Sequence, residues 1–284
     1  MSVYADASSP YHVYRCDGCG CGVTVPRPTP SEIASIYERT YDYDAHTLIA
    51  AEKRWRARRI LSRLSDEPFS SVLDVGCMYG YFLQEARNQG VGRVEGVELS
   101  ETPVAWARRQ GETVFQGSLE QYAATKPPAF DVIVAQHVVE HILDVDSFLR
   151  AAFSLLRPGG RLVVCVPHFG SRTQRWFKHT WGWYQLPAHL VHFSPAALGI
   201  LGQRYTAGTP QLTFRGGDSL FVLLTLLYSV AGRPRRTSAI TPLKKAVISL
   251  ASFALRPYYY VGDEEIVAVF RNSRTAVSPA RGQP

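Results

Sequence analysis

The sequence predicts an α/β fold of the doubly wound type, in which helices cover both faces of a mostly parallel sheet. From Ser71 onward, short apolar runs alternate with longer stretches of helical periodicity, as βαβ units require. The first run leads directly into Asp74-Val75-Gly76-Cys77-Met78-Tyr79-Gly80, so two glycines stand where a strand becomes a helix. In such sheets ligands bind at the carboxyl ends of the strands, and a glycine turn lets backbone N–H groups approach an anion.

The composition agrees with a folded, intracellular protein. The 284 residues are 46% hydrophobic and 19% charged, which excludes disordered and collagen-like classes and allows a sizeable core. Five cysteines are too few for a disulfide framework, so we expect a reducing, cytoplasmic environment. The N-terminus lacks the pattern of a secretory signal, and the most apolar segment, 219–231, is too short to cross a bilayer.

Five strands and three helices are expected between residues 71 and 167. Gly90, Gly111 and the Pro158-Gly159-Gly160 turn end the helices, and Ser100 provides an N-cap for the second one. In chain order we expect a strand at 71–76, a helix at 79–90, a strand at 91–100, a helix at 100–111, strands at 112–118 and 130–136, a helix at 144–160 and a strand at 161–167.

Helical and irregular segments flank this core. Residues 31–64 read as helical, with Pro30 and Glu32 supporting the start. After the core come an aromatic and histidine-rich loop at 168–193, a helix from Ser194 to about Gln203 and a strand at 211–216. The predicted organisation is a degenerate cysteine knuckle at 1–30, a helical cap at 31–66, a ligand-binding core at 67–217, an apolar and basic insert at 218–262, a final strand at 263–272 and a disordered tail at 273–284.

The glycine turn and a later acidic residue together predict a nucleoside-binding site. Glu98 follows Gly80 by eighteen residues and ends the second strand, where a carboxylate accepts both ribose hydroxyls of a nucleoside. The spacing D-x-G-x-x-x-G differs from the G-x-G-x-x-G of pyrophosphate binders, which disfavours a nicotinamide oxidoreductase. The simpler alternative is that the glycines only turn the chain.

The ordered motifs resemble those of the class I S-adenosylmethionine-dependent methyltransferases. VLDVGCMYGYFL resembles the first motif of that family, GVELS the acidic second, QGSLE the adenine-side turn, FDVIVAQHVVEHILDVDSFL the fourth-strand segment and LLRPGGRLVVCVP the fifth strand. The resemblance covers roughly residues 32–272 and implies seven strands with the last antiparallel, and S-adenosylmethionine as cofactor. One departure is Met78, which stands where the family commonly has glycine.

The resemblance also implies a set of cofactor-binding residues. It places Asp74, Gly76 and Gly80 around the methionine portion, Glu98 on the ribose, Ser118 and Leu119 beside the adenine, and Gln136 under the cofactor, with Cys77 and Leu99 in the same set.

His137-Val138-Val139-Glu140-His141 formally matches the H-x-x-E-H helix of a zinc-peptidase group. Its place directly after a sheet strand argues against a peptidase. In ubiquinone-biosynthesis-type O-methyltransferases a similar segment, with two acidic residues and a histidine, holds a divalent ion near the acceptor. His137 replaces one of those acids here, so a divalent metal is one alternative, and an ordinary helix cap by Glu140 and His141 is the simpler one.

The segment 168–194 combines aromatic side chains with histidines, a combination that could recognise a bulky acceptor and take its proton. WGWYQLPAHLVHFS resembles the corresponding pattern of bacterial methyltransferases that act on sugars and related metabolites. For each histidine, a hydrogen bond that pins the loop is an equally good explanation. The predicted walls are Trp176, Trp181, Trp183 and Tyr184. His168 is a further base, and the catalytic candidates are His137, His141, His189 and His192, of which His189 and His192 are favoured.

Near the start, Cys16, Cys19 and Cys21 follow His12 and resemble the second half of a zinc ribbon. The first C-x-x-C is missing, so four ligands would require His12 and all three cysteines in an unusual spacing. A metal-free remnant is therefore favoured over a zinc site.

The formal net charge of +7 and the insert at 218–262 bear on partners. Apolar stretches with basic ends suit an interfacial membrane contact, a homodimer face or a lid packed on the sheet. Basic and aromatic residues do not interleave, so no specific nucleic acid is expected.

Taken together, the residues and the resemblance predict methyl transfer from S-adenosylmethionine to a small-molecule acceptor. The favoured acceptor atom is a hydroxyl oxygen of a sugar, a lipid-linked molecule or a secondary metabolite. The alternatives are a catalytically silent cofactor-binding scaffold, which Met78 would allow, and a protein peripheral to the inner face of the membrane.

Overall fold

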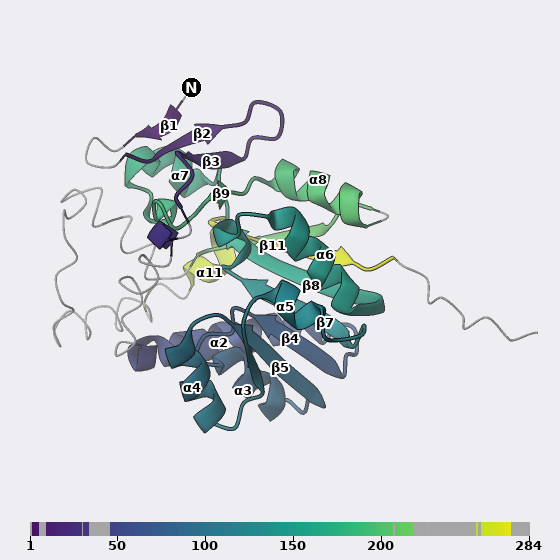
Figure 1. The fold of residues 1–284 in the computed structure, drawn as a ribbon. Helices are drawn as coiled ribbons and strands as arrows, with labels where there is room; N and C mark the ends of the chain where they lie inside the picture. The colour runs from purple at the N-terminus through teal and green to yellow at the C-terminus, as the bar shows by residue number, and fades with distance from the viewer. Residues whose placement is uncertain are drawn as a thin grey trace, which may run out of the picture.

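A seven-stranded sheet forms the centre of the molecule in the computed structural model, which describes residues 2–5, 10–29, 31–33, 46–206, 208–217, 226, 254 and 257–273 (Figure 1). The strand order is β10-β11-β8-β7-β4-β5-β6. The five strands from β8 to β6 are parallel to their neighbours, whereas β11 runs antiparallel to both β8 and β10. The bounds are β4 Ser71–Val75, β5 Arg93–Glu98, β6 Val114–Gln116, β7 Phe130–Gln136, β8 Leu156–Pro167, β10 Gln211–Arg215 and β11 Glu265–Arg271. The predicted doubly wound fold and antiparallel last strand are confirmed.

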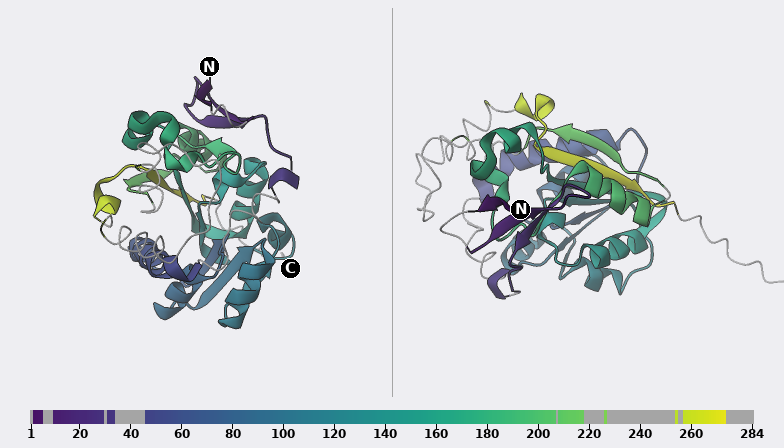
Figure 2. Two further views of the ribbon diagram at one scale, coloured as in Figure 1. Left: turned by 90° about the vertical axis from the view of Figure 1, so that its left-hand side faces the viewer. Right: turned by 90° about the horizontal axis from the view of Figure 1, so that it is seen from above.

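Helices cover both faces of this sheet, and each face has its own apolar core (Figures 1 and 2). One face packs against α2 (His46–Leu64), α3 (Tyr81–Asn88) and α4 (Glu101–Arg109). The other packs against α5 (Leu119–Ala123), α6 (Val145–Leu155) and α8 (Pro195–Tyr205). Because β4 and β7 are covered on both sides, their sequences are apolar without alternation.

Local sequence signals set most helix ends. Ser118 and Gln121 form a capping box at the start of α5, and the Asp144 side chain accepts a hydrogen bond from the Ser147 backbone at the start of α6. The α6 prediction was wrong at its end, because the helix stops at Leu155 and Leu156 already belongs to β8. Pro158 disfavours helical backbone at the residue before it, so the chain becomes extended one turn earlier than the Gly-Gly pair suggests.

A second, four-stranded antiparallel sheet lies over the segment that follows β8. It consists of β1 (Ser2–Ala5), β2 (His12–Arg15), β3 (Gly22–Val25) and β9 (Val191–His192). The intervening chain forms α7 (Arg172–Phe177) and the 3₁₀ turns η2 (Lys178–Thr180) and η3 (Gly182–Tyr184). The sequence did not indicate that the N-terminal hairpin would pair with β9. A third apolar cluster underlies this sheet and contains Val13, Phe169, Trp181, Trp183 and Tyr184.

Several predicted segments fall largely outside the described residues. The predicted helix at 31–64 is described at 31–33 and as α2, the insert at 218–262 is described at 226, 254 and 257–262, and the tail only at 273. The described end of the insert forms α11 (Tyr258–Val261). None of the helices in the described ranges combines the length and apolar character required to cross a membrane.

Candidate functional site

The turn between β4 and α3 has left-handed backbone at three positions. The φ angles are 68° at Gly76, 48° at Met78 and 71° at Gly80. Gly76 is also confined sterically, because a Cβ there would lie 2.5 Å from Cγ2 of Val138. Met78 adopts the backbone that glycine supplies more easily, at a cost of about 1 kcal/mol. The turn therefore keeps its shape without a glycine at position 78.

Glu98 lies at the carboxyl end of β5 and its carboxylate faces this turn. Oε2 accepts a hydrogen bond from the Met78 backbone N–H at 3.0 Å, and Oε1 accepts one from the Ser100 N–H at 2.8 Å. The side chain is buried and fixed by these two contacts. Each oxygen retains a second lone pair, so the carboxylate can still accept hydroxyl protons from a ligand.

Asp74 is buried at the end of β4, and its carboxyl group feels the negative charge of Glu98. Burial, and then the charge of Glu98, raises the pKa of Asp74 well above its usual value. Burial and the same two carboxylates also raise the pKa of the Cys77 thiol. A ligand that carries positive charge would relieve the repulsion between these carboxylates, so the site suits a cation.

The predicted cofactor residues all lie at or just past the carboxyl ends of four adjacent strands, in the order β7, β4, β5 and β6. Gln136 ends β7, Asp74 lies in β4, Glu98 ends β5 and Ser118 follows β6. Leu119 is buried, whereas 65% of the Leu99 side chain is exposed beside Glu98. The edge therefore gathers the predicted residues, and their contact with a cofactor stays a prediction.

His137 follows β7 and lies between two carboxylates. Its φ is 54°, its Nδ1 is 3.3 Å from Oε1 of Glu140, and its Nε2 is 3.2 Å from Oε1 of Glu265. The ring stacks on Trp183 with centroids 4.8 Å apart. Burial lowers the pKa of His137, but the charge of Glu265 and the contacts with Glu140 outweigh it, so the net shift is upward. The protonated ring satisfies both carboxylates at once.

A charged group behind His137 was not predicted from the sequence. Glu265 begins β11, is fully buried, and accepts hydrogen bonds from Arg56 of α2 and from Nε of Arg215 at 2.6 Å. Burial raises the pKa of Glu265, yet Arg56 and then Arg215 hold it well below its usual value. The signal in the sequence is the pair Glu264-Glu265 placed directly before an apolar strand, where two adjacent acids would be unusual without partners.

Glu264 is fully buried beneath the aromatic segment. Burial raises its pKa to about 7, although Thr173 and Trp183 act in the opposite direction. A Cβ on Gly217 would lie 2.7 Å from Oε2 of Glu264 and 2.9 Å from Nε1 of Trp183, so only glycine fits there. Trp181, Trp183 and Tyr184 are buried with it, whereas 76% of Trp176 is exposed.

His141, His189 and His192 lie near one another, with the His189 and His192 ring centroids 6.2 Å apart, but their hydrogen bonds differ. His192 is buried in β9, and its Nε2 lies 3.1 Å from Oγ1 of Thr24. Because that hydroxyl donates to the His189 carbonyl at 2.6 Å, the His192 ring must donate and is neutral. Burial, and then His141, lowers the pKa of His192 to about 3. His192 therefore links β9 to β3 of the N-terminal hairpin through Thr24.

His141 and His189 contact each other directly. Their rings meet edge to face with centroids 4.6 Å apart, and Nδ1 of His141 donates to the Ala188 carbonyl at 2.9 Å. Burial lowers the pKa of both rings, and His141 adds to the effect at His189. His168 lies apart from them, just past β8, with Nδ1 2.8 Å from the Asp263 carbonyl; burial lowers its pKa as well.

The three N-terminal cysteines lie together between β2 and β3. Their sulfur atoms are within 4.8 Å of one another, and Sγ of Cys19 is 3.2 Å from Sγ of Cys21. Hydrogen bonds from Cys19 lower the pKa of Cys16, whereas burial raises that of Cys21 to about 12. The candidate metal-ligating group in this part of the chain contains the three thiols without His12.

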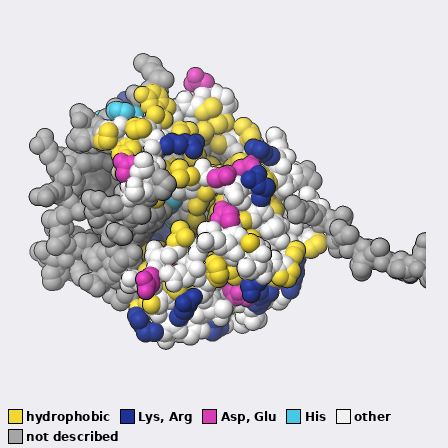
Figure 3. Space-filling view, in the orientation of Figure 1, with side chains coloured by type: hydrophobic (Ala, Val, Ile, Leu, Met, Phe, Trp, Pro, Cys, Tyr) yellow, Lys and Arg dark blue, Asp and Glu magenta, His cyan; other side chains and the backbone are white. Residues whose placement is uncertain are grey.

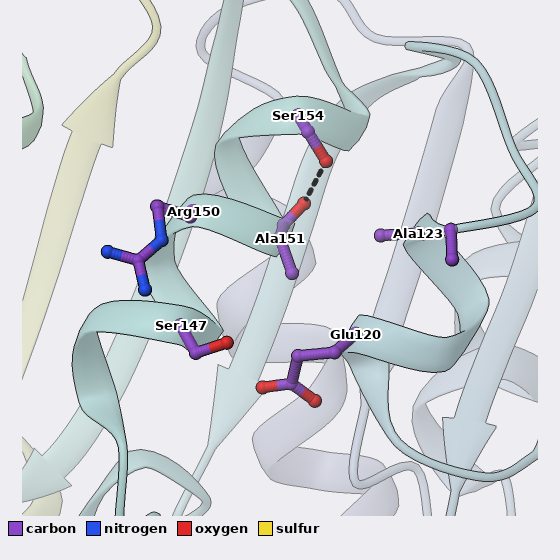
Figure 4. A pocket seen from close by; sticks show the side chains of 7 residues that line it. Glu120, Ala123, Ser147, Arg150, Ala151 and Ser154 are labelled. Carbon is purple, nitrogen blue, oxygen red and sulfur yellow. Dashed lines mark hydrogen bonds between the residues drawn. The ribbon is translucent and has the colours of Figure 1, made fainter.

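A surface hollow between α5 and α6 lies apart from these groups (Figure 4). Glu120, Ala123, Ser147, Arg150, Ala151 and Ser154 line it, and the Ser154 hydroxyl donates to the Ala151 carbonyl at 2.8 Å. On the face seen in Figure 3, basic and acidic side chains of the described residues are interspersed.

Comparison with known proteins agrees with this geometry. Residues 49–205 match the family model described as "Methyltransferase domain". The chain is 39% identical over 100 residues to the ubiquinone biosynthesis O-methyltransferase of Pseudomonas paraeruginosa and 33% identical over 99 residues to that of Aeromonas salmonicida. These alignments cover 33% of this chain and only 43% and 41% of the two relatives, so the chain matches less than half of their length.

Solved structures extend the likeness over most of the fold. A SAM-dependent methyltransferase from Archaeoglobus fulgidus aligns with a TM-score of 0.53 at 18% identity, covering 78% of this chain and 94% of the other. The 1,6-didemethyltoxoflavin-N1-methyltransferase of Burkholderia thailandensis, with bound S-adenosylhomocysteine, aligns with a TM-score of 0.50 at 18% identity over 95% and 98%. The fold, the glycine turn and the family match define a class I methyltransferase. The chain belongs to the S-adenosylmethionine-dependent methyltransferases, a family whose methyl donor is S-adenosylmethionine.

Proposed function

We propose that this protein methylates a hydroxyl oxygen of a small molecule, of the sugar, lipid-linked or secondary-metabolite kind. The observation that carries the proposal is the close approach of Gly76 to Val138. This approach places the turn between β4 and α3, here called the donor turn, against the segment that holds His137, Glu140 and His141. A donor and an acceptor would therefore meet at one edge of the sheet. The O-methyltransferase relatives support oxygen as the acceptor atom.

The donor residues fit the chemistry of their ligand. When bound, S-adenosylmethionine supplies an activated methyl group on a positively charged sulfur. A cation bound beside Asp74 would favour its ionised form, and Glu98 offers two fixed oxygens to ribose hydroxyls. Folding already orients these two carboxylates. Ligand binding therefore requires little rearrangement of the protein.

The hydrogen bonds of each histidine ring indicate which nitrogen could accept the proton of the acceptor hydroxyl. His137 contacts a carboxylate with each ring nitrogen, and burial lowers the pKa of His192 to about 3, which makes its remaining ring nitrogen a weak base. In His168, the Nδ1 proton is donated to the Asp263 carbonyl, which leaves the lone pair on Nε2. His168 also follows the end of β8, beside the strand that carries His137. We therefore favour Nε2 of His168 as the proton acceptor, with His141 and His189 as further candidates.

The test has two stages with matched variants. Calorimetric titration with S-adenosylhomocysteine should give binding that weakens about tenfold or more in Glu98→Gln and is unchanged in the exposed control Glu101→Gln, with NAD binding to neither. Transfer of isotope-labelled methyl groups to fractionated sugars, lipid-linked sugars and phenols should then identify the acceptor. Donor binding without transfer to any fraction would favour the silent scaffold, and loss of transfer in His168→Asn with intact donor binding would support the base.

The proposed setting is the cytoplasm. The predicted homodimer or membrane contact rests on the insert at 218–262, most of which lies outside the described residues. Vesicle flotation, with Leu223, Leu224 and Leu227 replaced by polar residues as the comparison, tests the membrane alternative.

A further inference from the structure

The three N-terminal thiols form a cluster that no step of the proposed methyl transfer uses. Cys16, Cys19 and Cys21 lie in the turn between β2 and β3, and their sulfur atoms lie within 4.8 Å of one another. The Cys19 thiol donates a hydrogen bond to Sγ of Cys21 at 3.2 Å. All three cysteines are free. Because each sulfur lies close to two others, an oxidised sulfur in this cluster has a second thiol within reach to attack it.

The backbone of the turn holds the sulfur atoms together. The Cys16 N–H donates to the Cys21 carbonyl at 2.8 Å, and the Gly20 N–H donates to the Cys16 carbonyl at 2.8 Å. Gly20 has a φ of 72°, a conformation that glycine adopts without steric cost. The thiols are therefore brought together by one short turn, and a disulfide between them requires no movement of distant segments.

The three thiols differ in their access to solvent. Cys16 is exposed, whereas Cys19 and Cys21 are partly buried. Hydrogen bonds from Cys19, and then from Gly18, lower the pKa of the Cys16 thiol, whereas burial raises the pKa of the Cys21 thiol. Cysteines that react with hydroperoxides are commonly accessible, have a lowered pKa and stand beside a second thiol. Cys16 meets all three conditions.

We propose that this cluster is a site of reversible oxidation, in which a hydroperoxide oxidises Cys16 and Cys19 then forms a disulfide with it. The Cys16 thiolate attacks one oxygen of the hydroperoxide, the O–O bond breaks, and the other oxygen leaves with a proton as water or an alcohol. The Cys19 thiolate attacks the resulting sulfenic acid at sulfur, the S–O bond breaks, and the hydroxyl leaves with a proton as water. Two thiols are thereby oxidised to one disulfide, and the hydroperoxide takes up the two electrons and two protons.

The turn that carries the thiols contacts the strand and the helix around the end of segment 168–194. The Ser194 hydroxyl donates to the Cys19 carbonyl at 2.5 Å and accepts from the Ala197 N–H at the start of α8. Gly22, directly after Cys21, pairs with His192 of β9. An oxidant that reaches the exposed thiol would therefore modify a turn that is bonded to β9 and α8. The inference goes beyond the proposed function, because oxidation is measured without donor or acceptor.

The test is hydrogen peroxide treatment of the reduced full-length protein, followed by alkylation of the remaining thiols and peptide mass mapping. We expect about two fewer alkylated thiols per chain, with Cys16 and Cys19 joined in a disulfide that dithiothreitol reverses. The buried Cys77 and Cys165 should stay reduced and serve as internal controls. Cys16→Ser should slow the loss of thiols by more than about tenfold, whereas the matched control Cys21→Ser should still form the disulfide.

A Cys19→Ser, Cys21→Ser double variant leaves Cys16 without a neighbouring thiol, so dimedone should label Cys16 as a sulfenic acid. Near-ultraviolet circular dichroism checks the folding of each variant, and the peptide map of the parent decides the pairing if a variant fails to fold. Retention of all five thiols by the parent, at peroxide concentrations that oxidise free cysteine, would overturn the proposal. So would equal rates in the parent and in folded Cys16→Ser, or a metal in the purified protein that protects all three thiols from peroxide.

Discussion

Replacement of Gly76 by alanine should disrupt the donor turn through two separable effects. The φ of 68° costs a residue with a Cβ about 1–2 kcal/mol. The new Cβ would also stand 2.5 Å from Cγ2 of Val138, and such overpacking costs roughly 1–3 kcal/mol. The sum is a loss of about 2–5 kcal/mol in the free energy of unfolding, measured by urea denaturation.

Two further variants separate these effects. Gly90 has a φ of 83°, and a Cβ added there would meet no atom within 4 Å, so Gly90→Ala should show the backbone cost alone. Adding Val138→Ala to Gly76→Ala should recover the steric part, after allowance for the effect of Val138→Ala by itself. If Gly76→Ala destabilises the protein no more than Gly90→Ala, then Val138 does not confine the turn. The close approach of donor and acceptor segments would then lose its support.

Three other predictions concern charge and backbone strain. Because the pKa of Asp74 is raised in the free protein, acidification protonates it first, so affinity for the cationic donor should fall at low pH and rise as Asp74 ionises. Calorimetry over a pH series checks this, and a slope that persists in Asp74→Asn would contradict it. Met78→Gly should raise the free energy of unfolding by about 1 kcal/mol in urea denaturation, whereas a loss of stability would show that the methionine side chain outweighs its strained backbone. Arg215→Met should lower that free energy by roughly 3–5 kcal/mol, because Glu265 keeps its buried charge with one fewer partner; a change below about 1 kcal/mol would mean that Arg56 suffices.

The sequence predicted the main sheet well because each of its elements has a local signal. Strand β7 is a continuous apolar run, α5 begins with its own cap, and Gly76 marks the ligand turn at the end of β4. The order of such elements restricts the topology to a few choices, since crossover connections between parallel strands are right-handed. The sequence could therefore place the predicted cofactor residues at one edge of the sheet before the fold was known, and their contact with a cofactor stays a prediction.

The surroundings of His137 and of the segment 168–194 could be predicted only in outline. Glu265 is defined by Arg56 and Arg215, which lie far away in the sequence and carry no periodic signal. Likewise, His192 has the same residue type as a catalytic base, and only the pairing of β9 with β3 shows that Thr24 occupies its Nε2. Side chains of this kind are assigned by long-range contacts, which single-sequence patterns do not encode.

The pairing of β3 with β9 has a consequence for how the chain matures. Gly22 pairs with His192, and the Ser194 hydroxyl donates to the Cys19 carbonyl at 2.5 Å. During synthesis the N-terminal hairpin leaves the ribosome long before β9 is translated. It therefore remains without this partner strand until most of the chain has been made. Closing such a long loop is slow, which places the docking of this hairpin late in folding. A nascent chain stalled before residue 191 would contain the turn between β4 and α3 but would lack β9 and its pairing with β3.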